Sequence, residues 1–157
     1  MSKCFFFSEN WKKINTGPVC FGARDNSYGA FKIRESGVIR TFKLVHLNGS
    51  ITCNPNYPPS YWGCDNPAYG DRRLLTVLTF KNRSALLLAD YRQNCGHSYK
   101  IEGVGVNETE LRFNNLPSAI SVSVGDELQI WYGQDLLNCS EDNNSGQTCA
   151  DVYAWYA

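Results

Sequence analysis

Short apolar segments separated by turn signals recur along the chain, and this spacing constrains the fold more than any other feature. Turns such as Asn-Asn-Leu-Pro at 114–117 and Gly-Asp at 125–126 follow one another at intervals of 8–12 residues. That interval is typical of all-β sandwiches and barrels, and a helical period of 3.6 residues is hardly present. The candidate strands are 30–34, 38–46, 51–53, 72–80, 85–90, 98–102, 110–113, 119–124, 127–133 and 148–156. We predict one all-β domain over residues 1–157, an antiparallel β-sandwich or a barrel-like structure.

Two stretches have more specific expectations. Asn48-Gly49 is a strong signal for a two-residue hairpin turn, so we predict a hairpin between strands 38–46 and 51–53. Residues 54–71 hold four of the six prolines and are predicted to be irregular.

The seven cysteines predict disulfide bonds rather than a zinc site, because no pair has C-x-x-C spacing and only two histidines are present. Disulfides indicate an oxidising environment, so we expect a secreted protein. The predicted pairs are Cys139–Cys149, Cys53–Cys64 and Cys20–Cys95. Cys4 remains, near a chain end, and is predicted to form an intermolecular bond in a homodimer. The alternative is an unpaired cysteine buried in the core.

The charge balance argues against two classes of partner. The chain carries 15 basic and 15 acidic residues, with no run of either sign. A nucleic-acid-binding surface or a polybasic membrane anchor needs clustered positive charge. The longest apolar stretches, such as 85–89, are far shorter than the ~20 residues of a membrane-spanning helix. We expect no nucleic-acid partner and no membrane span.

Oxygen-bearing side chains concentrate between residues 134 and 151. Ca²⁺ binds six to eight oxygens, with carboxylates balancing its charge and neutral oxygens completing the shell. Strand alternation places Asp151 on the same face as Cys149, so a Cys139–Cys149 disulfide would aim Asp151 into the loop. The predicted Ca²⁺ ligands are Gln134, Asp135, Glu141, Asn144 and Asp151. The alternative is a solvated turn, because Asp, Asn, Ser and Gly dominate turns for conformational reasons alone.

The same part of the chain resembles a known family. The resemblance is carried by Gly-Asp-Glu-Leu-Gln-Ile-Trp-Tyr-Gly-Gln-Asp-Leu at 125–136, by residues 141–146, and by Thr-Cys-Ala-Asp-Val-Tyr at 148–153. With its size and cysteine count, the whole chain resembles the galactose-specific, calcium-dependent lectins of sea anemones. The resemblance is most specific over 120–157. It implies a β-rich lectin in which Ca²⁺ directly binds the hydroxyls of galactose-terminated glycans.

Such a site needs hydrogen-bonding side chains and an aromatic ring for the apolar face of galactose. The expected sugar contacts are Gln134, Glu141, Asn143 and Asn144, because carboxylates accept hydrogen bonds and carboxamides also donate them. The expected ring comes from the cluster of Tyr57, Tyr61 and Trp62 in the proline-rich segment, and Trp62 is the predicted contact. Core packing is the better explanation for Trp131 and Trp155.

Two other functions compete with a lectin. A glycoside hydrolase needs two carboxyl groups ~5–10 Å apart across a cleft, and the adjacent Glu141 and Asp142 are poorly placed for that. A calcium-stabilised adhesion or structural module would bind the ion without a sugar. We expect a binding protein rather than an enzyme.

Overall fold

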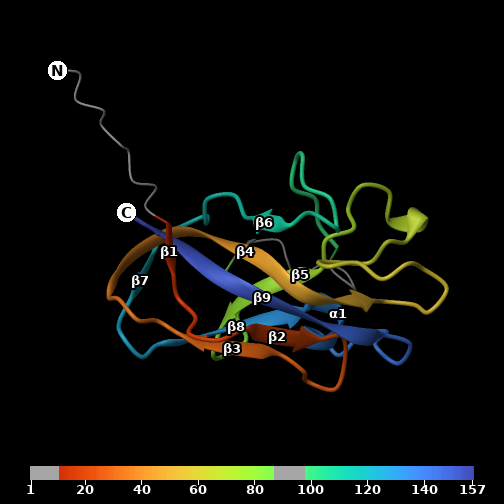
Figure 1. Ribbon diagram of the computed structural model, residues 1–157, viewed down its shortest axis with the longest axis horizontal. Helices are drawn as coiled ribbons and strands as arrows, with labels where there is room; N and C mark the ends of the chain where they lie inside the picture. Colours follow the sequence, from red (N-terminus) through yellow and green to blue (C-terminus); the bar gives the residue numbers. More distant parts are fainter. Residues whose placement is uncertain (1–10, 87–97) are drawn as a thin grey trace.

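The structure, a computed structural model, describes residues 11–86 and 98–157, and their regular structure is almost entirely β (Figure 1). The larger sheet has the order β1-β9-β4-β6, and in addition β2 pairs with β9 and β7 pairs with β4. Its strands are β1 (Trp11–Lys13), β2 (Val19–Gly22), β4 (Gly37–Thr52), β6 (Glu110–Arg112), β7 (Ile120–Val122) and β9 (Ser145–Tyr156).

The smaller sheet has the order β3-β8-β5, with β3 (Gly29–Lys32), β8 (Glu127–Tyr132) and β5 (Thr76–Phe80). All strand pairs are antiparallel. The two helical turns of the described residues are η1 (Pro67–Tyr69) and α1 (Gly133–Leu136). The predicted all-β, sandwich-like fold is confirmed.

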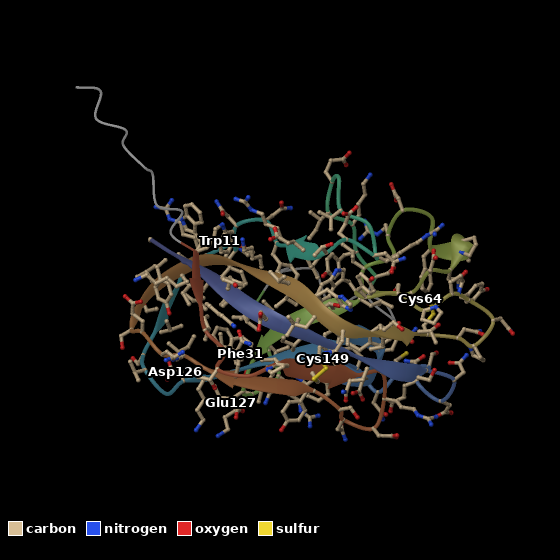
Figure 2. The ribbon with its side chains drawn as sticks, viewed as in Figure 1. Trp11, Phe31, Cys64, Asp126, Glu127 and Cys149 are labelled. Carbon is tan, nitrogen blue, oxygen red and sulfur yellow. A yellow bond between two sulfur atoms is a disulfide. The ribbon has the colours of Figure 1, made fainter. Side chains whose placement is uncertain are left out.

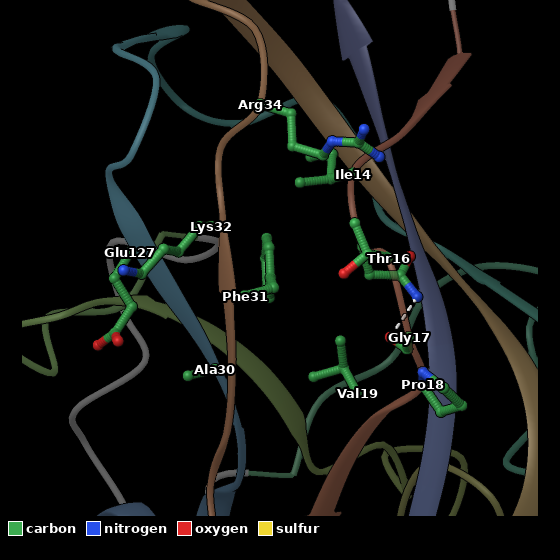
Figure 3. A pocket seen from close by; sticks show the side chains of 11 residues that line it. Ile14, Thr16, Gly17, Pro18, Val19, Ala30, Phe31, Lys32, Arg34 and Glu127 are labelled. Atoms are coloured by element: carbon green, nitrogen blue, oxygen red, sulfur yellow. Dashed lines mark hydrogen bonds between the residues drawn. The ribbon is translucent and has the colours of Figure 1, made fainter.

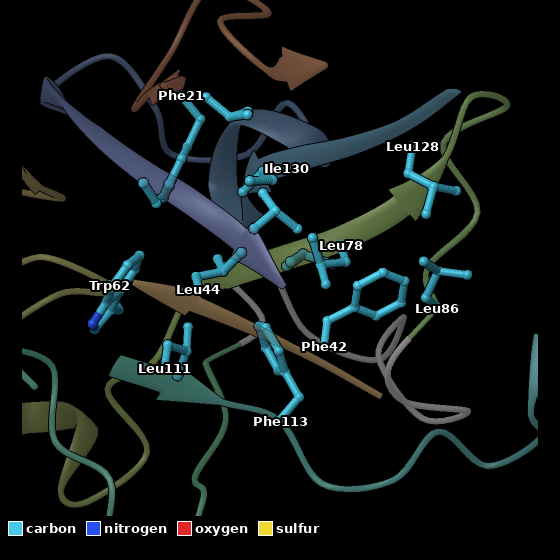
Figure 4. Close-up of a cluster of buried hydrophobic side chains, with 14 of the residues drawn as sticks. Phe21, Phe42, Leu44, Trp62, Leu78, Leu86, Leu111, Phe113, Leu128 and Ile130 are labelled. Atoms are coloured by element: carbon cyan, nitrogen blue, oxygen red, sulfur yellow. The ribbon is translucent and has the colours of Figure 1, made fainter. Parts of the chain in front are cut away.

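Large apolar side chains fill the space between the two sheets (Figure 4). On β8, Leu128, Ile130 and Tyr132 alternate toward this core, and Phe42 and Leu44 of β4 approach it from the larger sheet. Burying each of these side chains stabilises the fold by roughly 1.5–3 kcal/mol. One face of β8 therefore forms part of the core.

The expected hairpin at Asn48-Gly49 is wrong. β4 runs through this dipeptide without turning, and it pairs with β9 from Ile39↔Tyr156 to Thr52↔Ser145. The register shifts between His46 and Asn48, and Gly49 has a φ of 79°. A Cβ at Gly49 would lie 2.1 Å from the Gln147 carbonyl oxygen. The Asn-Gly pair thus forms a β-bulge, in which glycine supplies the left-handed conformation.

The disulfides agree with the sequence analysis at one pair. Cys53–Cys64 is confirmed, with a sequence separation of 11. Cys149 bonds Cys20 rather than Cys139, because β2 and β9 place these two residues directly opposite each other in register (Figure 2). Cys139 is disulfide-bonded to a different partner. The predicted Cys139–Cys149 and Cys20–Cys95 pairs are therefore wrong.

Some expectations fall on residues that the structure does not describe. Cys4, Cys95 and most of the predicted strand 85–90 lie outside the described residues. The expected strand at 98–102 is reduced to isolated bridges, Leu74↔Tyr99 and Ile101↔Val104. Within the described ranges, no helix is long and apolar enough to cross a membrane.

Candidate functional site

The turn at 23–27 contacts α1 and the loop at 139–144, two neighbouring segments that lie far from it in the sequence. The carboxylate of Asp135 on α1 accepts hydrogen bonds from the backbone N–H groups of Asn26 (2.9 Å) and Ser27 (2.8 Å). The turn can present these groups because Asp25 and Asn26 both adopt left-handed backbone conformations, which Asp and Asn tolerate better than most residues. Asp135 is buried, and these two hydrogen bonds hold its carboxyl group in place between the turn and α1.

Glu141 brings a second carboxyl group to Asp135. Burial, together with the hydrogen bond and the negative charge of Asp135, raises the pKa of Glu141 to about 7, while a hydrogen bond from the backbone of Asp25 acts in the opposite direction. Two carboxyl groups this close disfavour double ionisation. A cation between them would remove that penalty.

Three buried oxygens of this cluster have no hydrogen-bond partner among the described residues: Gln134 Oε1, Glu141 Oε2 and Asn144 Oδ1. The amide nitrogens of Gln134 and Asn144, in contrast, have partners. Asn144 Nδ2 donates to the Ala23 carbonyl at 3.0 Å, and Gln134 Nε2 contacts the Tyr69 hydroxyl at 3.4 Å. Buried acceptors in folded proteins almost always have a partner. These oxygens therefore mark a position for a ligand that accepts lone pairs.

The donor set fits a hard divalent cation. Ca²⁺ prefers oxygen ligands, and the cluster offers two carboxylates and two carboxamide oxygens. The described residues contain no group of three or more His, Cys, Asp and Glu side chains suited to a metal ion. A cation at this cluster would thus depend on the amides of Gln134 and Asn144 as well as on Asp135 and Glu141.

The structure does not bring Asp151 to this cluster. Its Oδ1 accepts from Asn15 Nδ2 at 2.7 Å and lies 3.5 Å from Lys13 Nζ. At ~3.3 Å per residue along a strand, Asp151 is roughly 20 Å from Asn144. The prediction that Asp151 is a ligand relied on a Cys139–Cys149 bond that does not form. The prediction that Asp151 belongs to this site is therefore wrong.

Two expected sugar contacts also lie elsewhere. The amide nitrogen of Asn143 donates to the Cys53 carbonyl at 3.0 Å and to the Ser140 carbonyl at 3.2 Å. This side chain therefore links the loop at 139–144 to the residue that follows β4. Trp62 is completely buried, and its indole N–H donates to the Glu108 carbonyl at 2.7 Å. A ring with no exposed surface cannot stack on a sugar, so the expectation for Trp62 is wrong.

The comparisons with known proteins address the fold. No protein-family model matches the chain, and no curated protein matches it significantly. Among solved structures, the chain is similar to AJLec from the sea anemone Anthopleura japonica, with a TM-score of 0.86 and 29% sequence identity. The match covers 94% of this chain and 97% of that chain. The fold is that of a sea anemone lectin.

In this lectin-like fold, the aromatic residue in contact with the oxygen cluster is Tyr69, which the sequence analysis did not identify. η1 presents it: the Asn66 side chain caps the turn by accepting from Ala68 N, and Arg73 Nε donates to the Gly70 carbonyl at 2.6 Å. Asn-Pro before an aromatic residue is a readable turn signal. Its position beside Gln134, however, depends on contacts between segments 65 residues apart.

Proposed function

We propose that this protein is a calcium-dependent lectin that binds galactose-terminated glycans through Ca²⁺ held by Gln134, Asp135, Glu141 and Asn144. The observation that carries the proposal is the set of three buried oxygens, on Gln134, Glu141 and Asn144, that have no partner among the described residues, together with the hydrogen bond between Glu141 and Asp135. Leaving each acceptor without a partner costs about 1–3 kcal/mol. A site that binds its ion tightly recovers this cost when it is loaded.

The side chains have separate tasks in this proposal. Asp135 and Glu141 supply the negative charge, and the turn at 23–27 holds Asp135 in position before any ligand arrives, which lowers the ordering cost of binding. When bound, Ca²⁺ would supply coordination positions at which two neighbouring sugar hydroxyls can replace water. The carboxylates can also accept hydrogen bonds from those hydroxyls. The Tyr69 hydroxyl, next to Gln134, is a further polar group within the site.

Two findings support a carbohydrate ligand and a secreted protein. The similar structure, AJLec, is a sea anemone lectin, which favours glycan binding over catalysis. The disulfides Cys20–Cys149 and Cys53–Cys64 fit an extracellular environment. The preference for galactose follows from the resemblance of residues 125–153 to the galactose-specific family.

The direct test is calorimetric titration of the protein with methyl galactoside, in calcium and in excess chelator. We expect binding with calcium and none with chelator, together with a higher melting temperature in calcium because the ion binds the folded state. Methyl glucoside should bind more weakly, since the orientation of its 4-hydroxyl differs. Stabilisation by calcium without sugar binding would instead identify a structural module, and turnover of an aryl galactoside would identify a hydrolase.

We also propose a disulfide-linked homodimer through Cys4. Two sites on one molecule raise avidity for surfaces with many glycans by ~10²–10⁴-fold. Non-reducing electrophoresis tests this: we expect a band at twice the 17.7 kDa chain mass that becomes monomeric in the Cys4→Ser variant. A monomeric wild-type band without reductant would contradict the covalent dimer.

A further inference from the structure

A cleft opens between the two sheets where β2 and β3 separate, with a volume of about 370 Å³ (Figure 3). The two strands approach each other closely at Gly29, where a Cβ would lie 2.7 Å from both the Cys20 carbonyl oxygen and Val19 Cγ1. Beyond that point β2 follows the larger sheet and β3 follows the smaller one. The cleft is thus a consequence of the sandwich geometry, and it shares no residue with the oxygen cluster.

The interior of the cleft is apolar and its wall is preformed. Its floor consists of Ile14, Val19 and Phe31, which belong to the core and are at most 5% exposed, and the exposed apolar residues Pro18 and Ala30 lie on its two sides (Figure 3). The wall formed by the connection between β1 and β2 is held by Asn15. Its amide donates to the Gly17 carbonyl at 2.9 Å and to Asp151 at 2.7 Å, and it accepts from Val152 N at 2.8 Å.

Arg34 extends across one end of this apolar cleft (Figure 3). Among the described residues, no carboxylate lies within ion-pair distance of its guanidinium group. The other two charges at the cleft, Lys32 and Glu127, are register partners in β3 and β8 and offset each other. Their side chains extend to the other side of β3 from Phe31 (Figure 3). The uncompensated charge that faces the cleft is therefore positive.

From this geometry we propose that the cleft binds a small amphipathic carboxylate, such as a medium-chain fatty acid. Its volume is at the small end of the ~300–1,000 Å³ range of ligand pockets, which suits a short alkyl chain rather than a long one. The alkyl chain would lie over this floor between Pro18 and Ala30, and the Arg34 guanidinium would bind the carboxylate through a charge-assisted, bidentate hydrogen-bonded pair. This site is independent of the proposed calcium and sugar site.

Calorimetric titration of the whole protein with octanoate, below its micelle concentration, tests the proposal. We expect one octanoate per chain, with affinity rising roughly threefold to fourfold for each methylene from hexanoate to octanoate. Arg34→Gln should weaken binding by about tenfold. Arg40→Gln is the matched control: it removes the same charge from an exposed arginine of β4 that does not line the cleft, and it should leave the affinity unchanged. Both positions are exposed, so neither variant should unfold.

Uncharged and cationic analogues, together with a blocking variant, complete the test. Octanol should bind far more weakly than octanoate, and octylamine should not bind. Thr16→Trp places a large ring at an exposed position of the wall and should abolish octanoate binding without loss of calcium binding. No octanoate binding, equal binding of octylamine, or equal losses in Arg34→Gln and Arg40→Gln would each overturn the proposal.

Discussion

Two acidic regions of the molecule differ in whether their polar groups have partners within the fold. Asp151 lies between Lys13 and Asn15, and the Asn15 side chain uses both its nitrogen and its oxygen within the fold. Asp135 instead lies beside a second acid, Glu141, whose Oε2 has no partner in the described part of the chain. The polar groups of the first region are satisfied within the fold, whereas the second region has acceptors open to the ion proposed above.

This contrast separates structural from functional polar groups more clearly than residue type does. Both regions contain Asp and Asn, and both are largely buried. A satisfied network stabilises the fold, while unpaired acceptors beside like charges destabilise it. Proteins retain such a cluster where a ligand offsets the cost. Variants in each region should therefore have opposite effects on stability.

The largest effect is expected from Asn15→Ala. This variant removes the Asn15 donor from Asp151, which keeps the ion pair with Lys13, and it removes the acceptor for the buried Val152 N–H group. We expect a loss of about 3 kcal/mol in the free energy of unfolding, measured by denaturant titration. Asn115→Ala, at an exposed asparagine, is the control and should change stability by less than about 0.5 kcal/mol. Similar losses in both variants would contradict the contrast.

Glu141→Gln should have the opposite effect on stability. In chelator, it removes the carboxyl repulsion with Asp135 and should raise the melting temperature. In calcium, it should weaken binding of the ion by roughly tenfold to a hundredfold, equivalent to about 1.4–3 kcal/mol, and galactose binding should fall with it. Calorimetry with calcium measures this directly.

Two neighbouring acids serve as controls for Glu141. Asp142→Asn changes an exposed acid in the same loop, and Asp151→Asn changes the acid of the satisfied region. Neither should alter the affinity for calcium. A loss in Asp151→Asn as large as in Glu141→Gln would restore Asp151 to the site and contradict the geometry described above.

Local sequence was enough to predict part of the oxygen cluster. Gln134, Asp135, Glu141 and Asn144 lie within eleven positions of one another, and the alternating pattern of β8 leads directly to them. The Cys53–Cys64 bond, which closes a short loop, was predictable for the same reason. Residues that are close in sequence also lie close in space, so local sequence patterns can predict that such residues meet.

The contributions that escaped prediction come from distant segments. The turn that binds Asp135 is 108–109 residues away in sequence, and the Cys20–Cys149 bond joins residues 129 apart. Val-Cys-Phe-Gly at β2 is too short to identify as a strand without its partner β9. Asp151 was assigned to the site because alternation gives the face of a strand but not the distance along it.

The third prediction concerns pH. Because the pKa of Glu141 is raised to about 7 from an ordinary value of 4.5, the folded state binds a proton between these values that the unfolded state releases. Without calcium, stability should therefore fall as pH rises from about 4.5 to 7 and change little above that. Bound calcium would favour the ionised carboxylate, so its affinity should rise over the same interval.

Melting temperatures between pH 4.5 and 8 test this dependence, in chelator and in saturating calcium. The difference between wild type and Glu141→Gln isolates the contribution of this carboxyl from those of the two histidines. If the two proteins have the same pH profile in chelator, Glu141 does not titrate in this interval and the contact with Asp135 is weaker than described.

The smallest effect is expected from Tyr69→Phe, which removes only the hydroxyl group 3.4 Å from Gln134 Nε2. If that hydroxyl contacts a sugar bound at the oxygen cluster, affinity for methyl galactoside should fall by roughly threefold to tenfold, the value of one hydrogen bond at about 0.5–1.5 kcal/mol. Affinity for calcium should not change, because the four proposed ligands remain. Tyr57→Phe, at another partly buried tyrosine, is the matched control and should affect neither ligand. An unchanged affinity for galactoside in Tyr69→Phe would exclude Tyr69 from the sugar site, while a parallel loss of calcium would show that its hydroxyl positions Gln134 instead.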